Sequence, residues 1–101
     1  MPDEWWDETQ SVNARGVFLG CKHASAQMIR QEPVPGEDRG TIINIASVLG
    51  LVGRQDRSAY SASKGAVISL TRAVSKDCAE LGIRVNAISP GCEFFLFHSN
   101  A

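Results

Sequence analysis

The most constraining feature of this chain is a long helical pattern between two short apolar runs that are rich in β-branched residues. The runs are residues 41–47 and 83–88, and the helical pattern covers residues 58–81. Runs of this kind are typical of strands buried on both faces. A strand, a long helix and a second strand predict a βαβ unit, in which two parallel strands are joined by a right-handed crossover. The fold class is therefore α/β.

Capping residues and an apolar stripe define the helix of this unit. Ser58 is a suitable N-cap, and Leu81-Gly82 would close the helix as a C-cap. The small members of the stripe fit close packing against another helix. The stripe consists of Ala59, Ala62, Ala66, Val67, Leu70, Ala73 and Val74.

A first helix is expected over residues 3–31, followed by an exposed loop rich in proline and glycine. Pro2 and the acidic residues after it suit a helix start. The order helix, strand, helix, strand predicts part of a Rossmann-type, doubly wound parallel sheet. The apolar positions recur at helical spacing, and Gly16 and Gly20 between them allow a close approach of a neighbour. These positions are Val17, Cys21, Ala24 and Met28, widened by Phe18 and Ile29.

Composition excludes several classes of function. A chain of 101 residues holds at most one domain. The net charge is -1 and the charges are interspersed, so neither a nucleic-acid nor a membrane surface is indicated. No apolar run approaches the ~18 residues that cross a bilayer. The three cysteines lack metal-ligand spacing, so we expect no metal site and a reducing compartment, the cytoplasm.

Tyr60 and Lys64 stand four residues apart in the helical pattern, on one face of the helix. A phenol exchanges its proton poorly at neutral pH, but a neighbouring cation and a helix N-terminus both favour the phenolate. In parallel sheets, ligands bind outside the carboxyl ends of the strands. Ser47 ends the first run and Pro90-Gly91 follows the second. These residues therefore predict a site at this edge of the sheet, with Tyr60 as a proton-transfer group.

The chain resembles the short-chain dehydrogenase/reductase family from about residue 5 to residue 91. Ser47 precedes Tyr60 by thirteen residues, as the pattern of that family expects. The resemblance rests on four segments in the family order, and the third is the Y-x-x-x-K motif. These are Asn13-Ala14-Arg15-Gly16-Val17-Phe18, Ile43-Asn44-Ile45-Ala46-Ser47, Tyr60-Ser61-Ala62-Ser63-Lys64 and Arg84-Val85-Asn86-Ala87-Ile88-Ser89-Pro90-Gly91.

The resemblance implies hydride transfer between a nicotinamide ring and an alcohol or carbonyl carbon of a small molecule. Tyr60 would be the general acid/base for the substrate oxygen, and Ser47 would donate a hydrogen bond to that oxygen. Lys64 would favour the phenolate of Tyr60. Asn13, in the first helix, would hold a water that links Lys64 to solvent.

The resemblance also implies NAD or NADP as cofactor, with Tyr60, Lys64, Pro90 and Gly91 as binding residues. Lys64 would bind the ribose, and Pro90 and Gly91 would pass close to the nicotinamide. The glycine-rich phosphate loop of the family would precede residue 1, and so would the residue that chooses between NAD and NADP. Residues 1–91 then form the catalytic portion of a Rossmann-type domain. Residues 92–101 are interpreted as a tail outside the family pattern.

Three hypotheses remain open from the sequence. The first is an NAD(P)-dependent short-chain oxidoreductase. The second is a non-catalytic remnant that retains only the helix-pairing surface with which family members form homo-oligomers. The third uses the Tyr/Lys pair for epimerisation or dehydration. In each case two strands leave sheet edges and apolar faces uncovered, so we expect marginal stability or aggregation of the isolated chain.

Overall fold

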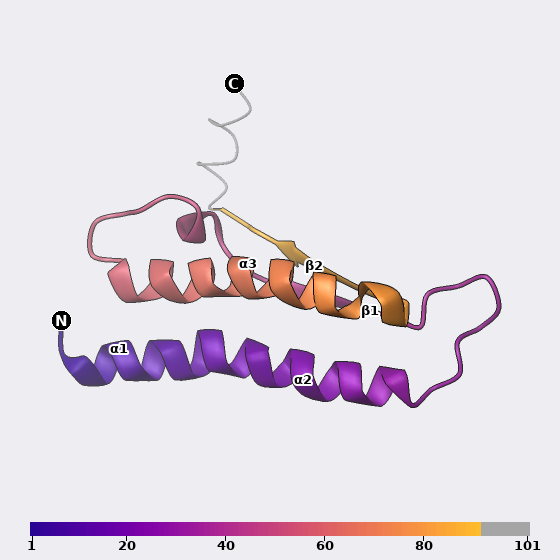
Figure 1. Cartoon of the computed structure of the whole chain (residues 1–101). Coiled ribbons are helices and arrows are strands. Elements are labelled where there is room, and N and C mark those ends of the chain that lie inside the picture. Colours follow the sequence, from indigo (N-terminus) through magenta and orange to yellow (C-terminus); the bar gives the residue numbers. More distant parts are fainter. Residues whose placement is uncertain (92–101) are drawn as a thin grey trace, which may run out of the picture.

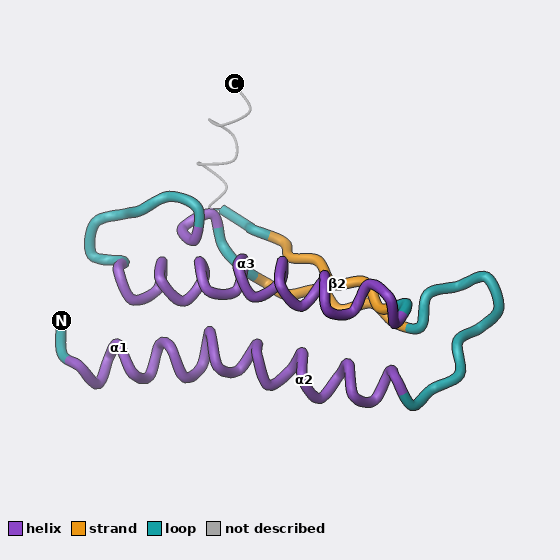
Figure 2. Tube along the Cα trace, viewed as in Figure 1, coloured by secondary structure: helices purple, strands orange, loops and turns teal. Residues whose placement is uncertain are grey.

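The computed structural model describes residues 1–91. The helical elements follow one another without a break from Asp3 to Ile29, and the remaining elements form the strand–helix–strand unit (Figures 1 and 2). This arrangement confirms the predicted α/β class. In chain order the elements are α1 (Asp3–Thr9), the π-helix η1 (Gln10–Arg15), α2 (Gly16–Ile29), β1 (Gly40–Ile45), the 3-10 helix η2 (Val48–Gly50), α3 (Ser58–Cys78), the 3-10 helix η3 (Ala79–Leu81) and β2 (Ile83–Ile88).

The two strands form a parallel two-stranded sheet, as predicted from the crossover. Ile42 is paired with Val85 and Ile45 with Ile88. The second strand has the predicted bounds, whereas the first begins and ends earlier than expected. One further backbone bond, from the Ala46 N–H to the Ile88 carbonyl at 2.8 Å, continues the ladder past β1. The chain then turns away from the sheet.

The first helical segment, α1–α2, and the crossover helix α3 cover the same face of the sheet. The segment α1–α2 runs alongside α3, with α2 packed on β1 and α3 on β2 (Figure 1). The core lies between them and contains two buried cysteines. Its members are Cys21, Ile42, Cys78, Ile83 and Val85.

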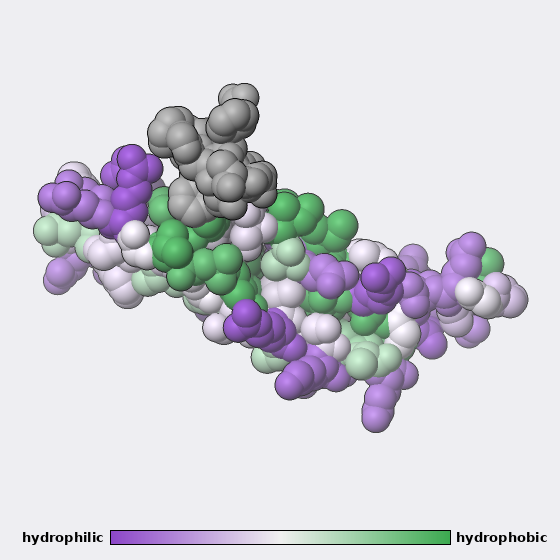
Figure 3. Space-filling view, turned by 90° about the horizontal axis from the view of Figure 1, so that it is seen from above, coloured by the Kyte–Doolittle hydropathy of each residue, from purple (hydrophilic) through white to green (hydrophobic). Residues whose placement is uncertain are grey.

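The opposite face of the sheet is bare within residues 1–91. Ile43, Ile45 and Ile88 are 55%, 53% and 51% exposed. The expectation of strands buried on both faces is therefore wrong for this part of the chain, because helices cover only one side. Figure 3 shows hydrophobic surface gathered in the middle of the molecule, with polar side chains toward both ends. Apolar surface thus meets water, as expected for two strands alone.

The buried face of α3 differs from the predicted stripe. Its buried residues include Ser63 and Thr71, whereas Ala62, Ala66 and Ala73 are exposed. The two hydroxyls can be buried because they bond to the carbonyls of Tyr60 and Val67 at 2.7 Å each. The helix starts one residue earlier than the capping prediction. Arg57, not Ser58, is the N-cap residue, and its side chain forms no capping bond.

The predicted stripe of the first helix is confirmed in part. Cys21 is buried, and Val17, Ala24 and Met28 pack against the core. The widening of the stripe was wrong, because Phe18 and Ile29 are 45% and 46% exposed.

One arginine binds the ends of both helical layers at the edge opposite the carboxyl ends of the strands. The Arg39 guanidinium donates to the Ile29 and Gln31 carbonyls at 3.3 and 2.6 Å, and to the Leu81 carbonyl at 3.0 Å. Gly82 takes the left-handed conformation (φ 74°), which confirms the predicted C-cap. These contacts satisfy carbonyls that have no partner within their helices.

Candidate active site

The carboxyl ends of the two strands and the N-terminal end of α3 lie at the same end of the molecule (Figure 1). A cleft of about 650 Å³ opens there, and Ser47, Tyr60, Pro90 and Gly91 line it. The Val48 N–H donates to the Pro90 carbonyl at 2.9 Å, so the segments after the two strands are joined directly. The structure thus brings together four of the residues singled out in the sequence.

The loop after β1 sits on α3 through a glycine. A Cβ at Gly50 would lie 2.6 Å from the carbonyl carbon of Lys64 and 2.8 Å from the nitrogen of Gly65. Real Cβ atoms do not approach backbone atoms so closely, so this contact requires a residue without a side chain. The contact sets the position of the Ser47 turn relative to the helix that carries Tyr60 and Lys64.

Tyr60 and Lys64 are neighbours on α3, as their spacing predicted. The Lys64 ammonium lies 5.7 Å from the centre of the Tyr60 ring. It also donates a 3.1 Å hydrogen bond to the carbonyl of Ile45, the last residue of β1. This bond holds the charge between the phenol and the end of the strand.

Ser47 is 7% exposed and caps the short helix η2. Its hydroxyl oxygen accepts a hydrogen bond from the Leu49 N–H at 3.2 Å. A hydroxyl that accepts one bond keeps its own hydrogen for donation. Ser47 therefore has a free donor at the wall of the cleft.

Asn13 does not line this cleft. It lies in the π-helix η1, and its amide nitrogen donates to the Ser63 hydroxyl at 3.1 Å. Ser63 is fully buried, and its hydroxyl donates a hydrogen bond to the Tyr60 carbonyl. Gln10, also in η1, donates to the Ala59 carbonyl at 2.9 Å. Asn13 is therefore linked to the backbone of Tyr60 by two successive hydrogen bonds through Ser63.

Sequence reasoning missed both Gln10 and Ser63 as site residues. Ser63 belongs to the Y-x-x-x-K segment, but it was expected on no particular face. The π-helix, which turns Gln10 and Asn13 toward α3, left no signal in the apolar pattern, because the predicted stripe begins only at Val17. Arg54 and Arg57, from the loop after β1, also line the cleft.

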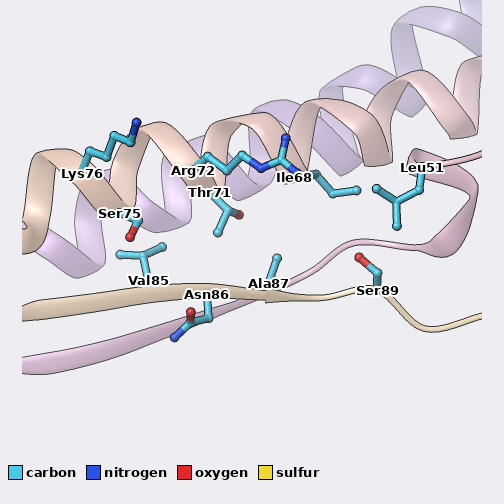
Figure 4. Close-up of a pocket in the computed structure, with 10 residues that line it drawn as sticks. All are labelled: Leu51, Ile68, Thr71, Arg72, Ser75, Lys76, Val85, Asn86, Ala87 and Ser89. Atoms are coloured by element: carbon cyan, nitrogen blue, oxygen red, sulfur yellow. The ribbon is translucent and has the colours of Figure 1, made fainter.

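A second groove runs between α3 and β2, and none of the predicted site residues lines it. Figure 4 shows Ile68, Thr71 and Arg72 on the helix, and Val85 and Ala87 on the strand. This groove follows the edge of β2 that has no partner strand among residues 1–91. Its lining includes Ser75 and Lys76 but none of Ser47, Tyr60 and Lys64, so the cleft at Ser47 and Tyr60 is the candidate active site.

Other kinds of site find no support in the part of the chain that the structure describes. Residues 1–91 contain no cluster of His, Cys, Asp and Glu that could hold a metal ion. None of their helices is long and apolar enough to cross a membrane. Cys21 and Cys78 are buried free thiols, as expected of idle cysteines.

Fold and site together define a class. The parallel strands and crossover helix are part of a Rossmann-type α/β fold, and the carboxyl edge of the sheet carries a Ser, Tyr and Lys set. A family model described as short chain dehydrogenase matches residues 1–93. The chain belongs to the short-chain dehydrogenase/reductase family.

Three similar proteins illustrate the relationship. The 2-(R)-hydroxypropyl-CoM dehydrogenase of Xanthobacter autotrophicus is 48% identical over 90 residues, which cover 89% of this chain and 34% of that protein. The crystal structure of 3-hydroxyacyl-CoA dehydrogenase type-2 from Mycobacterium avium matches with a TM-score of 0.87 and 32% identity, over 90% of this chain and 36% of that one. NAD⁺-bound xylitol dehydrogenase matches with a TM-score of 0.80 and 41% identity, over 89% and 32% of the two chains. The chain thus spans about a third of the length of these relatives.

Proposed function

We propose that the chain carries the acid/base centre of an NAD(P)-dependent oxidoreductase that acts on a small alcohol or carbonyl compound. The observation that carries the proposal is the shared cleft of Ser47 and Tyr60, with the Lys64 ammonium 5.7 Å from the phenol ring. The names of the three relatives refer to hydroxyl compounds, which supports an alcohol or carbonyl substrate.

In this proposal Tyr60 exchanges a proton with the substrate oxygen. The Lys64 ammonium, 5.7 Å from the centre of the phenol ring, is the cation nearest to this transfer in the proposal. The hydroxyl of Ser47 donates a hydrogen bond to the same oxygen and so stabilises the negative charge that develops on it. Both groups belong to a wall that is held by backbone contacts, so little reorganisation is needed.

The residues at this edge fit the nicotinamide end of the cofactor. Lys64 would hold the ribose, and Pro90 and Gly91 would lie along the ring, where a glycine permits a close approach. When bound, the nicotinamide supplies or accepts the hydride. One of the relatives is an NAD⁺-bound enzyme, which supports NAD or NADP here without choosing between them.

Asn13 is proposed to act through a water toward Lys64. Its amide nitrogen is bonded to Ser63, so the side-chain oxygen is the group left for that water. The two buried free thiols suit a reducing compartment, which supports the cytoplasm as location.

The proposal is tested by mixing the chain with NADH or NADPH and a panel of ketones and following the absorbance of the reduced cofactor. Tyr60→Phe should lower turnover by about 10²- to 10⁴-fold, as removal of an acid/base group does. Lys64→Met should also lower turnover. Its control is Lys22→Met, at an exposed lysine of α2, which should leave turnover unchanged. Equal turnover in the wild type and in Tyr60→Phe would eliminate the assigned role.

A second candidate is a non-catalytic protein that pairs through its helices into homo-oligomers. Exposed small residues at helical spacing on α3 favour it, namely Ala62, Ala66 and Ala73. Calorimetric titration with NADH and NADPH separates the two functions, because only the first requires binding. Ala66→Glu should dissociate an oligomer in sedimentation experiments, and an unchanged sedimentation coefficient would exclude this surface.

A further inference from the structure

The candidate active site has an uneven charge. Ten residues line the cleft, and its permanently charged members are Arg54 and Arg57. Among residues 1–91, no aspartate or glutamate lines it. The part of the wall that residues 1–91 supply therefore carries two positive charges and no negative one.

Neither arginine is neutralised within residues 1–91. The ion pair found there joins Arg84 to Asp38 at 3.9 Å, on another part of the molecule. Arg57 donates one bond, at 3.1 Å, to the backbone carbonyl of Asp56, and within residues 1–91 the side chain of Arg54 makes no hydrogen bond. The contrast is Arg39, whose guanidinium is occupied by three carbonyls. Arg39 thus uses three of its five N–H donors to hold structure together, whereas Arg54 and Arg57 keep most of theirs within residues 1–91.

The apolar surroundings strengthen the attraction of the two arginines for an anion. Much of the remaining wall is apolar, with Val48, Leu49 and Val52 on the loop after β1. A concave site with low-dielectric walls of one charge sign concentrates ligands of the opposite sign. Guanidinium groups match carboxylates, sulfonates and phosphates with two parallel hydrogen bonds.

We propose that the substrate carries an anionic group, which Arg54 and Arg57 bind while its carbonyl or alcohol group lies at Ser47 and Tyr60. The placement of the reacting end rests on the function proposed above. The binding of the anion does not, and it can be measured without turnover.

The probes are matched pairs of ketones that differ in charge. Levulinate is compared with methyl levulinate, and acetonylphosphonate serves as a second anion of different geometry. Binding to the 101-residue chain is followed by amide chemical shifts of the loop after β1. The variants are Arg54→Met, Arg57→Met and the charge-retaining Arg57→Lys. Arg72→Met, at an exposed arginine of α3 outside the cleft, is the control.

We expect an anion to bind the wild type at least about tenfold more tightly than the ester, because a hydrogen bond to a charged group is worth about that factor. Each Met variant should lose most of this preference, Arg57→Lys should regain part of it, and Arg72→Met should keep it. Added salt should weaken the binding of the anion and leave the binding of the ester unchanged. A stronger response to acetonylphosphonate than to levulinate would indicate a phosphorylated substrate, and the reverse a carboxylate.

Equal binding of anion and ester, or the absence of binding by either, would overturn the proposal. So would an equal loss of preference in Arg72→Met. ADP-ribose is a further probe, since it carries the phosphates of the cofactor without the nicotinamide. If it alone shifts the Arg54 and Arg57 signals, the arginines bind cofactor and the proposal fails. Retained anion preference without any turnover would instead refute the oxidoreductase proposal and leave this one standing.

Discussion

Asn13 and Ser63 are fifty residues apart in the sequence and joined by a 3.1 Å hydrogen bond from the Asn13 amide to the Ser63 hydroxyl. The hydroxyl in turn donates to the Tyr60 carbonyl at 2.7 Å. A buried hydroxyl that both accepts and donates joins its two neighbours into one hydrogen-bond network. The first helix is thereby coupled to the backbone of the residue that carries the phenol.

Ser63→Ala should lower the free energy of unfolding by about 1–3 kcal/mol, because the Asn13 amide loses its partner. Ser69→Ala, at an exposed serine of the same helix, should change it by less than about 0.5 kcal/mol. Urea unfolding of both variants measures the difference. In a double-mutant cycle, Asn13→Ala should add little to Ser63→Ala. Additive losses would mean that the two side chains do not act together.

Gly50→Ala should destabilise the chain by about 1–3 kcal/mol, because the new methyl group meets backbone atoms of Lys64 and Gly65 that cannot move aside. Gly53→Ala is the matched control in the same loop, where nothing lies within 4 Å of a new Cβ. It should be neutral or stabilising by about 0.4–1 kcal/mol. Thermal unfolding compares the two, and equal melting temperatures would contradict the close packing of the loop on α3.

Ile43→Thr and Ile45→Thr should reduce aggregation and the binding of a hydrophobic fluorescent dye. Both side chains lie on the bare face of the sheet, and threonine preserves the preference for strand structure. The free energy of unfolding should change by less than about 0.5 kcal/mol. Ile42→Thr, at a position only 9% exposed on the covered face, should instead cost about 1–3 kcal/mol. Similar losses at the three positions would mean that both faces are covered.

Stability should fall at alkaline pH because of Cys78. Burial raises the pKa of this thiol, and the Asp77 carboxylate and Cys21 raise it further. As the pH rises, the unfolded chain therefore loses the thiol proton first. The contribution is complete below the ordinary thiol pKa of about 8.5 and is lost as the pH climbs toward the higher folded value. Urea unfolding between about pH 7 and pH 10 should show this slope, and Cys78→Ala should flatten it. An unchanged slope in Cys78→Ala would assign the loss to another group.

Much of the fold could be predicted because the short β-branched runs of the strands differ clearly from the helical repeat of apolar residues between them. The β-branched run at residues 83–88 gave the bounds of β2, and the long helical pattern gave α3 with its 3-10 end. The direction of the strands followed from the length of the crossover. The covered face of α3 could not be predicted from hydropathy. Ser63 and Thr71 are polar, and they are buried with hydrogen bonds: each hydroxyl donates to a carbonyl one turn earlier and accepts from an asparagine amide.

The candidate site was predictable where spacing decides it and not where loops do. Tyr60 and Lys64 share a face because a helix repeats every 3.6 residues, and Ser47 and Pro90 follow paired strands. The contact of Asn13 depends on a π-helix, and the position of Arg54 and Arg57 depends on the path of an irregular loop. No periodic pattern encodes the contact of Asn13 or the path of the loop, because neither depends on regular α-helix or strand structure.

The π-helix η1 divides the long first helix into two halves with different angular phases. Each π turn holds one residue more than an α turn, which rotates everything before it by about 100° relative to everything after it. Accordingly α1 packs on α3, while α2 also reaches β1. A helical wheel drawn through all of Asp3–Ile29 therefore superimposes faces that point in different directions. Deleting a single residue of η1 would swing Trp5 and Trp6 around the axis and leave the core contacts of α2 in place.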